Sequence, residues 1–204
     1  MRLTVNTFLS VDGVMQGPGA ADEDPSNGFD RGGWLVPLAD EDMDSLVSGW
    51  FRQADAILLG RSTYEMMQPY WELVTDGSDV VADALNHLPK YLVSSTIAEP
   101  SWHNTSVISG DVLGAIGELK EHSQGELQVH GSYRLARALH DAGMVDEYRL
   151  LIFPVVVGSG KRLFEDGAAP SSFMVTGTHI TKSGIVALSL LPRPFTVAEM
   201  PREP

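Results

Sequence analysis

Hydrophobic residues along this chain come in short runs bounded by glycine, proline or other turn-forming residues, and these runs alternate with longer segments of mixed polarity. Short bounded runs are typical of strands, whereas apolar residues at three- and four-residue spacing indicate helices. We predict strands at residues 3–9, 54–59, 91–94, 106–108, 127–130 and 147–157. We predict helices at residues 40–52, 62–68, 80–87, 111–122 and 132–141, with Pro69 ending the second.

The end of the chain has a different pattern. Residues 173–181 and 185–191 alternate in polarity around Lys182-Ser183-Gly184, which predicts an antiparallel hairpin. Strands alternating with helices and then a hairpin indicate an α/β fold, with a three-layer, mixed but mainly parallel sheet and helices on both faces. We expect residues 1–204 to form a single domain with a long loop at residues 10–38, and loops of this length are usually functional or mobile.

Composition narrows the functional classes. The chain has 204 residues, 43% of them hydrophobic, which is enough for one sizeable core. It has no cysteine, so disulfides and cysteine-based metal sites are excluded, and its histidines lack metal-binding spacing. No segment approaches the ~20 apolar residues of a membrane span, and a signal peptide is not evident, so we expect a cytoplasmic protein. The net charge of −13 argues against nucleic acid and anionic lipid as partners.

Gly60, Arg61, Ser62 and Thr63 follow the apolar run at residues 56–59 and open a predicted helix. The carboxyl edge of a parallel sheet, where strands turn into helices, is where α/β proteins bind nucleotides. We therefore predict that these residues bind a nucleotide cofactor. The simpler alternative is a turn that needs glycine for its geometry, with Thr63 starting the helix.

A group of hydroxyls, from Ser94, Ser95 and Thr96, follows the next predicted strand. Together with the guanidinium of Arg61, they would suit a phosphate monoester such as the 2′-phosphate of NADPH. The alternative is that these hydroxyls only cap the next turn.

His130, Gly131, Ser132, Tyr133 and Arg134 form a third strand-to-helix junction. A glycine that opens a helix lets backbone N–H groups face a pyrophosphate, so we predict that these residues also bind the cofactor. A plain turn is the alternative.

Four stretches in this order resemble the dihydrofolate reductase-like fold, and more closely the riboflavin-biosynthesis reductase (RibD C-terminal domain) family and its stand-alone members. The resemblance covers nearly the whole chain. The stretches are residues 8–14, 58–65, 90–95 and 129–132, and the last is followed by Leu135, residues 145–147, residues 154–160 and Leu163-Phe164.

The resemblance implies an enzyme that reduces small heterocyclic or carbonyl-like substrates with NADPH, often as a homodimer. In the family, the residues that match Arg61 and Thr63 contact the adenosine phosphates. The loop that matches Gly158, Ser159 and Gly160 helps to shape the mouth of the active site, although a tight surface turn is an alternative here. Family members often have two glycines, sometimes joined by a cis peptide, where this chain has His130-Gly131.

Two departures from folate reductases argue against dihydrofolate as the substrate. An arginine that holds the glutamate tail is replaced by Leu88 or its neighbour Pro89, and a threonine that binds the pterin network falls near Leu151. Losing an arginine–carboxylate pair removes a strong and specific contact.

The substrate side of the site is less marked in the sequence. Phe8, Met15, Trp34 and Tyr64 could line a pocket for a flat ring, although aromatic residues at element ends more often belong to the core. Asp44 lies sixteen residues before Gly60, the spacing of the substrate-binding carboxylate in folate reductases, and is a candidate proton donor. The alternative, which we favour, is that Asp44 is one of several acids that stabilise a helix start.

The leading interpretation is an NADPH-dependent reductase acting by direct hydride transfer on a small heterocyclic or carbonyl-type substrate. One alternative is the riboflavin-pathway pyrimidine reductase, and another is a non-catalytic nucleotide-binding dimeric protein on the same scaffold. A homodimer is expected from the apolar residues 155–157 and the terminal hairpin.

Overall fold

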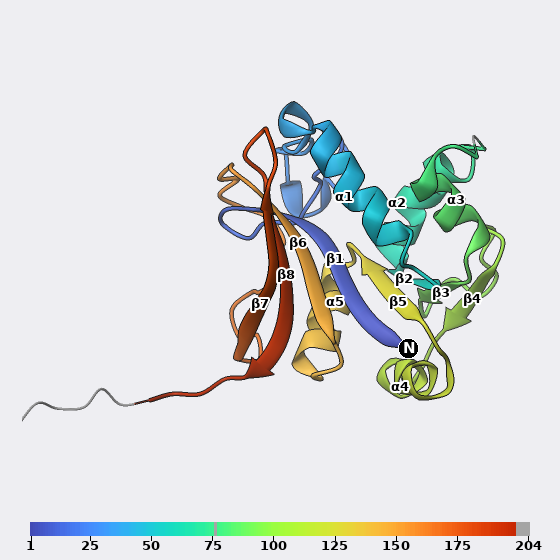
Figure 1. The fold of residues 1–204 in the computed structure, drawn as a ribbon. Helices are drawn as coiled ribbons and strands as arrows, with labels where there is room; N and C mark the ends of the chain where they lie inside the picture. The colour runs from blue at the N-terminus through green and yellow to red at the C-terminus, as the bar shows by residue number, and fades with distance from the viewer. Residues whose placement is uncertain (76, 199–204) are drawn as a thin grey trace, which may run out of the picture.

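An eight-stranded sheet runs through the protein in the order β4-β3-β2-β5-β1-β6-β8-β7 (Figure 1). Neighbouring strands are parallel from β4 to β6, and β8 is antiparallel to both of its neighbours. The computed structural model describes residues 1–75 and 77–198. The strands are β1 (Arg2–Ser10), β2 (Ala56–Gly60), β3 (Lys90–Val93), β4 (Thr105–Ile108), β5 (Glu126–His130), β6 (Glu147–Phe153), β7 (Ser171–Ile180) and β8 (Val186–Pro194). The predicted α/β class, the mainly parallel sheet and the terminal hairpin are confirmed.

Helices cover both faces of this sheet. They are α1 (Glu41–Phe51), α2 (Arg61–Trp71), α3 (Val80–His87), α4 (Val112–His122) and α5 (Tyr133–Asp141). β2 shows why two layers are needed, because its side chains alternate between faces and all its apolar ones are buried. Leu58 packs with α4 and α5, whereas Ile57 and Leu59 pack with α1, α2 and α3.

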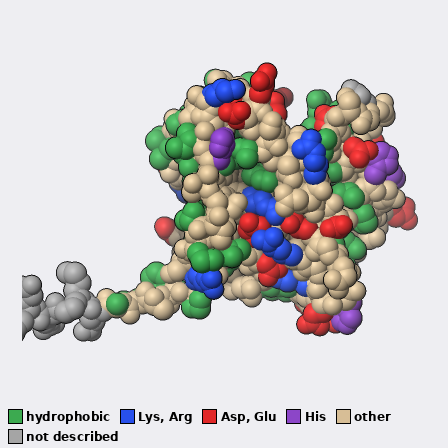
Figure 2. All heavy atoms as spheres, in the orientation of Figure 1, with side chains coloured by type: hydrophobic (Ala, Val, Ile, Leu, Met, Phe, Trp, Pro, Cys, Tyr) green, Lys and Arg blue, Asp and Glu red, His purple; other side chains and the backbone are tan. Residues whose placement is uncertain are grey.

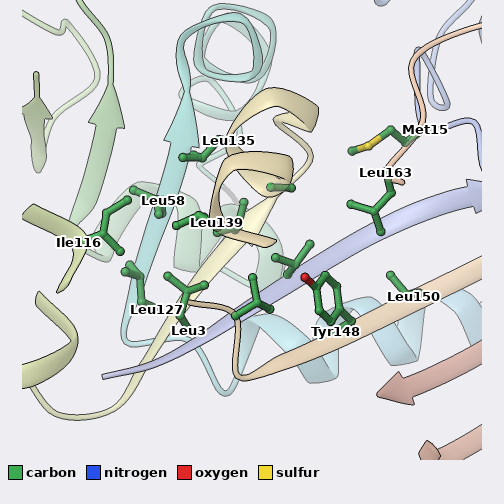
Figure 3. Close-up of a cluster of buried hydrophobic side chains, with 14 of the residues drawn as sticks. Leu3, Met15, Leu58, Ile116, Leu127, Leu135, Leu139, Tyr148, Leu150 and Leu163 are labelled. Atoms are coloured by element: carbon green, nitrogen blue, oxygen red, sulfur yellow. The ribbon is translucent and has the colours of Figure 1, made fainter. Parts of the chain in front are cut away.

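The larger hydrophobic cluster lies between the sheet and helices α4 and α5. Figure 3 shows Ile116 from α4 and Leu135 and Leu139 from α5 directed at side chains of the strands, including Leu58 and Leu127. All five are buried. This layer fixes α5 against β2, β5 and β1, and thereby fixes the strand-to-helix turn that precedes α5.

Two predicted boundaries were wrong, both beside a proline. α2 continues through Pro69 to Trp71, although a proline loses one helical hydrogen bond and crowds the turn before it, because other contacts hold the next turn. Glu72 N–H donates to the carbonyl of Gln68, and Asn86 Nδ2 donates to the carbonyl of Trp71. β6 ends at Phe153 and does not reach residue 157, because Pro154 cannot donate to a ladder.

The long loop at residues 10–38 is folded against the segment after β6. It contains two 3₁₀ turns, at Ser26–Gly28 and Val36–Leu38. The carboxylate of Asp12 accepts hydrogen bonds from the backbone N–H groups of Val157 and Gly158, at 3.0 and 2.8 Å. The indole N–H of Trp34 donates to the carbonyl of Gln16, at 2.8 Å. These contacts hold the loop in one place beside the sheet edge.

On the α1 side, the amino ends of the central strands carry charged side chains. Figure 2 shows basic and acidic side chains next to one another in the middle of this face. A cavity of about 380 Å³ lies here, lined by residues that include Arg2, Trp50, Glu147 and Arg149. The aromatic residues lie further along the strands, towards the carboxyl edge, where Phe8 stacks on Trp50 with ring centres 6.3 Å apart.

Candidate functional site

The strand-to-helix turns after β2 and β5 touch each other at the carboxyl edge of the sheet. Ser132 Oγ accepts from the backbone N–H of Gly60 at 2.8 Å and donates to Thr63 Oγ1 at 2.8 Å. A Cβ atom on Gly60 would lie only 3.1 Å from Ser132 Oγ, so a larger residue here would crowd this contact. The second turn is tightened by Gly131 and Ser132, which have positive φ angles of 61° and 58°. One serine hydroxyl therefore locks the two predicted cofactor-binding turns together.

The helices that begin at these turns differ from the others at their N-termini. Side chains of Asp40, Asp79 and Asp111 cap α1, α3 and α4 by accepting from backbone N–H groups. Among the described residues, no side chain caps α2 or α5, whose N-cap residues are Gly60 and Ser132. Uncapped N–H groups and the helix dipole favour an anion at a helix N-terminus. Two such ends meet at the Gly60–Ser132 contact, which is an arrangement suited to a pyrophosphate.

Arg61 and the hydroxyl segment after β3 are neighbours, as the sequence predicts. Arg61 Nη1 donates to Thr96 Oγ1 at 3.3 Å, and half of the Arg61 side chain is exposed. Ser95 is exposed beside them, whereas Ser94 is buried and its hydroxyl accepts from the backbone N–H groups of Thr96 and Ile97. Arg61, Ser95 and Thr96 can therefore face a phosphate, while Ser94 shapes the turn that presents them.

A second group of side chains surrounds the start of α5. Lys161 Nζ lies 5.2 Å from the centre of the Tyr133 ring and also contacts Asp24 and Ser26 of the long loop. The exposed guanidinium of Arg134 donates to the Tyr133 hydroxyl at 2.9 Å. Arg134 therefore places a positive charge beside an uncapped helix start in a chain of net charge −13, whereas the charge of Lys161 is paired with Asp24.

A cavity of about 300 Å³ opens between the long loop, the start of α5 and the segment after β6. Ser159 and Gly160, two of the residues predicted for the substrate side, line it, whereas Gly158 is outside the lining and bonds to Asp12. A Cβ atom on Gly160 would lie 2.8 Å from Val14 Cγ1, so this position accepts only glycine without rearrangement. The full lining is Gln16, Ser26, Asn27, Gly28, Phe29, Tyr133, Ser159, Gly160, Lys161 and Glu165.

The sequence profile of the RibD C-terminal domain matches residues 2–188, which is nearly the whole chain. The chain belongs to the RibD C-terminal domain family. It is similar to the protein YyaP of Bacillus subtilis (strain 168), with 24% identity over 188 residues that cover 92% of this chain and 93% of YyaP.

Solved structures give the same fold at lower identity. A pyrimidine reductase-like protein from Corynebacterium diphtheriae superimposes with a TM-score of 0.65 and 12% identity, covering 95% of this chain and 92% of that one. A dihydrofolate reductase from Enterococcus faecalis, solved in complex with NADP(H), superimposes with a TM-score of 0.62 and 11% identity, covering 95% and 97%. The fold is therefore dihydrofolate reductase-like.

Several residues predicted for the substrate side of this RibD-type domain lie in its core. Met15 is buried in the cluster beneath α5, beside Leu163 in Figure 3. Tyr64 is buried, and its hydroxyl accepts from the backbone N–H of Trp102 at 2.8 Å. Phe8 and Trp34 both pack on Phe153, so they lie together, but as part of an aromatic cluster. The structure favours the packing alternative for Met15 and Tyr64.

Asp44 is exposed in the first turn of α1, which is the position expected of an acid that stabilises a helix start. Nothing in its surroundings supports a role as proton donor. Lys90 begins β3, the strand that leads to the hydroxyl segment, but its side chain is also outside the site. It is 1% exposed, donates to the carbonyls of Leu85 and Leu88 at the end of α3, and has its pKa lowered to about 8 by burial.

His130 has a different environment from the one its sequence position indicates. Its side chain stacks on Phe51, with ring centres 4.2 Å apart, and its Nε2 atom is 2.9 Å from Gln128 Oε1. Burial, and then the positive charge of Arg149, lower the pKa of His130 to about 3. The peptide bond between His130 and Gly131 is trans, as are all the described peptide bonds. His130 is therefore neutral and adds no charge to the predicted pyrophosphate position.

The sequence analysis missed part of the site. Gln16 connects the loop to the segment after β6 by accepting from the Lys161 N–H and donating to the carbonyls of Asp24 and Ser26. Asp12, whose pKa is held low by hydrogen bonds from Ser10, Val157 and Gly158 that outweigh its burial, anchors the same loop. No spacing in the chain signals these long-range pairs.

Across residues 1–75 and 77–198, no cluster of acidic and histidine side chains could hold a metal ion, and no helix has the length and apolarity to cross a membrane.

Proposed function

We propose that this member of the RibD C-terminal domain family is an NADPH-dependent reductase that transfers a hydride directly to a small heterocyclic or carbonyl-type substrate. The observation that carries the proposal is the meeting of two uncapped helix N-termini at the Gly60–Ser132 contact, next to Arg61 and Thr96. A dinucleotide with a 2′-phosphate offers anions to both places.

The roles of the cofactor-binding residues follow from this geometry. The first-turn N–H groups of α2, at Arg61, Ser62 and Thr63, and of α5, at Tyr133 and Arg134, would bind the pyrophosphate. Arg61, with Ser95 and Thr96, would bind the 2′-phosphate and favour NADPH over NADH. When bound, the dihydronicotinamide supplies the hydride, while the chain supplies orientation and a site of restricted water access.

The substrate would enter from the side of the 300 Å³ cavity. Its lining is mainly polar, with the amide of Gln16, the ammonium of Lys161 and the carboxylate of Glu165, which suits a polar heterocycle better than an apolar carbonyl compound. This favours the riboflavin-pathway pyrimidine as a specific candidate. A non-catalytic nucleotide-binding role is the remaining alternative, since the one predicted proton donor, Asp44, is exposed at a helix start.

Titration with NADPH and NADH tests the cofactor. We expect NADPH to bind more tightly, and Arg61→Ala to weaken NADPH binding by about tenfold to a hundredfold while NADH binding changes little, because a charge-assisted hydrogen bond contributes about 1.5–3 kcal/mol. Arg52→Ala, at the exposed end of α1, is the matched control. If the wild-type protein binds neither nucleotide, the proposal is wrong.

Turnover separates an enzyme from a nucleotide-binding protein. NADPH oxidation would be followed at fixed protein concentration with aldehydes, quinones and aminopyrimidines as substrates. Oxidation that depends on both substrate and protein, and that falls in Arg61→Ala, supports the reductase. Tight NADPH binding with no turnover on any of these classes would favour the non-catalytic alternative.

A further inference from the structure

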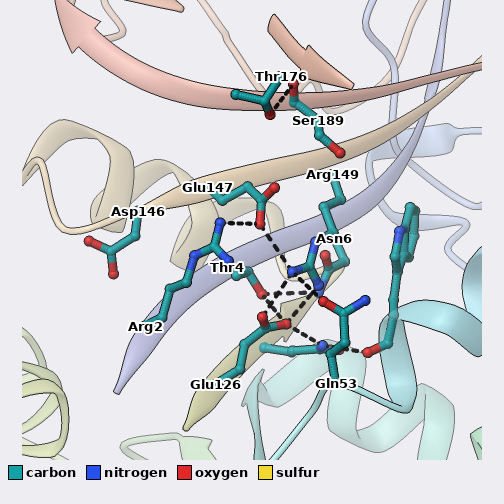
Figure 4. A network of polar contacts seen from close by, with 12 residues as sticks. Arg2, Thr4, Asn6, Gln53, Glu126, Asp146, Glu147, Arg149, Thr176 and Ser189 are labelled. Atoms are coloured by element: carbon teal, nitrogen blue, oxygen red, sulfur yellow. Dashed lines mark hydrogen bonds and ion pairs between the residues drawn. The ribbon is translucent and has the colours of Figure 1, made fainter. Parts of the chain in front are cut away.

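A chain of buried polar side chains leads from the middle of the sheet to His130. Arg149 donates two hydrogen bonds to the carboxylate of Glu126, at 2.7 and 2.8 Å, and both residues are more than nine-tenths buried (Figure 4). Gln128 is fully buried on the same strand face and donates its amide N–H groups to Glu126 Oε1 and to the carbonyl of Trp50. Both of these oxygens can only accept, so they fix the orientation of the Gln128 amide.

The orientation of Gln128 determines which ring nitrogen of His130 carries the proton. With its N–H groups committed, Gln128 presents Oε1 to His130 Nε2 at 2.9 Å. An amide oxygen only accepts, so Nε2 must be the protonated nitrogen. Because the pKa of His130 is about 3, the ring is neutral at pH 7. Its Nδ1 atom is therefore an unprotonated hydrogen-bond acceptor.

Nδ1 faces away from Gln128. The two nitrogens are separated by Cε1 and point away from each other in the ring plane, so Gln128 does not engage Nδ1, and His130 itself is the last residue of β5, at the carboxyl edge of the sheet. No hydrogen bond to Nδ1 is formed by the described residues. Asn6, which pairs with His130 across β1 and β5, is 1% exposed, and its Oδ1 atom also has no partner among the described residues. Two neighbouring acceptors near the cofactor edge thus lack a donor from the protein.

We propose that His130 is a specificity-determining residue: its Nδ1 atom accepts a hydrogen bond from an uncharged N–H or O–H group of the molecule bound at this edge. This inference rests on the proposed function. A neutral acceptor here disfavours a phosphate and favours a hydroxyl, an amide or a ring N–H. The donor belongs either to the cofactor, as a ribose hydroxyl or the carboxamide, or to a heterocyclic substrate.

Nitrogen NMR of histidine-labelled protein tests the inference directly. In the ligand-free protein at pH 7, we expect His130 to show one protonated nitrogen, Nε2, with Nδ1 unprotonated. In one arm NADP⁺ is added alone, and in the other uracil is added to the NADP⁺-saturated protein. A shift of the Nδ1 resonance towards that of a hydrogen-bonded nitrogen in the first arm assigns the donor to the cofactor, and a shift only in the second assigns it to the heterocycle.

Other outcomes overturn the inference. A protonated Nδ1, or a charged ring at pH 7, contradicts it whatever the ligand does. If calorimetry shows NADP⁺ binding but neither addition shifts the Nδ1 resonance, the His130 proposal is wrong and the cofactor proposal stands. If NADP⁺ does not bind at all, the proposed function fails and the role of His130 in ligand selection fails with it.

Variants give a second, independent readout. His130→Phe keeps a flat ring for stacking on Phe51 but removes both nitrogens, and we expect the binding of the ligand identified by NMR to weaken about tenfold. His130→Asn restores an acceptor oxygen near the Nδ1 position and should recover most of the loss. His103→Phe, at an exposed position in the turn before β4, is the matched control and should have no effect. Equal weakening in His130→Phe and His130→Asn would indicate a packing role only.

Discussion

At the scale of single residues, burial of a titratable group has a consequence for stability that can be measured without a ligand. The pKa of His130 is about 3 in the folded protein, first because burial penalises the charged ring and second because Arg149 is close. In the unfolded chain its pKa is about 6.5. Between these values the unfolded state binds one more proton than the folded state, so stability falls as pH falls.

We therefore expect the unfolding free energy to fall by about 2 kcal/mol between pH 7 and pH 5 because of His130. Below pH 6.5, a difference of one bound proton lowers the unfolding free energy by at most about 1.4 kcal/mol per pH unit. The measurement is urea denaturation of wild type and His130→Phe at both pH values. The difference between the two proteins should change by about this amount, whereas His103→Phe, at an exposed position in the turn before β4, should track wild type. A difference independent of pH would show that His130 titrates normally.

The residues whose positions could be predicted are those fixed by local sequence. Gly60, Arg61 and Thr96 stand at strand ends, and the parallel sheet brings strand ends together wherever the strands pair. Tyr64 and Met15 could not be placed in this way, because whether an aromatic or apolar side chain faces a cavity or the core depends on what packs against it. Trp102, thirty-eight residues away, decides the environment of Tyr64.

At the scale of elements, the N-terminus of α2 is left uncapped in a way that should cost stability and favour ligand binding. Ser62→Glu would place a carboxylate in the first turn, where it interacts favourably with the helix dipole. We expect a gain of about 0.3–1 kcal/mol in unfolding free energy together with a loss of NADPH affinity of about tenfold, because the same carboxylate repels the phosphates.

The matched control for Ser62→Glu is Leu113→Glu, at the corresponding position of α4, whose N-terminus is already capped by Asp111. It should change stability in the same direction and leave NADPH binding unchanged. Urea denaturation and NADPH titration of both variants give the comparison. Unchanged NADPH affinity in Ser62→Glu would mean that the phosphates do not approach α2.

Most elements could be predicted because their hydrophobic patterns are local. α3 spans residues 80–87 as predicted. The alternation of polar and apolar residues correctly predicted that β7 and β8 form a hairpin. The boundaries that failed depend on contacts from elsewhere, such as the Asn86 side chain that supports the end of α2 beyond Pro69. The strand order could not be predicted either, since β5 pairs with both β1 and β2 and no local pattern specifies a partner so far along the chain.

At the scale of the whole molecule, the sheet ends in an uncovered strand. Within β7, Met174, Val175 and Ile180 are 40%, 55% and 67% exposed, and the strand contains no lysine, aspartate, glutamate or proline. Edge strands in monomers are usually protected by such residues, because an unprotected edge pairs with other chains. Val156, in the segment predicted to form an apolar edge, is 75% exposed. These surfaces support the proposal of a homodimer.

If β7 contributes to the dimer interface, a charge placed on it should dissociate the dimer. We expect sedimentation velocity at micromolar concentration to give a dimer mass for wild type and a monomer mass for Val175→Lys, because burying an unpaired ammonium costs several kcal/mol. Leu73→Lys, at an even more exposed apolar position in the turn after α2, should remain dimeric. A monomeric wild type would contradict the homodimer. If Val175→Lys remains a dimer, β7 does not form the interface, and the apolar segment around Val156 is the surface to test next.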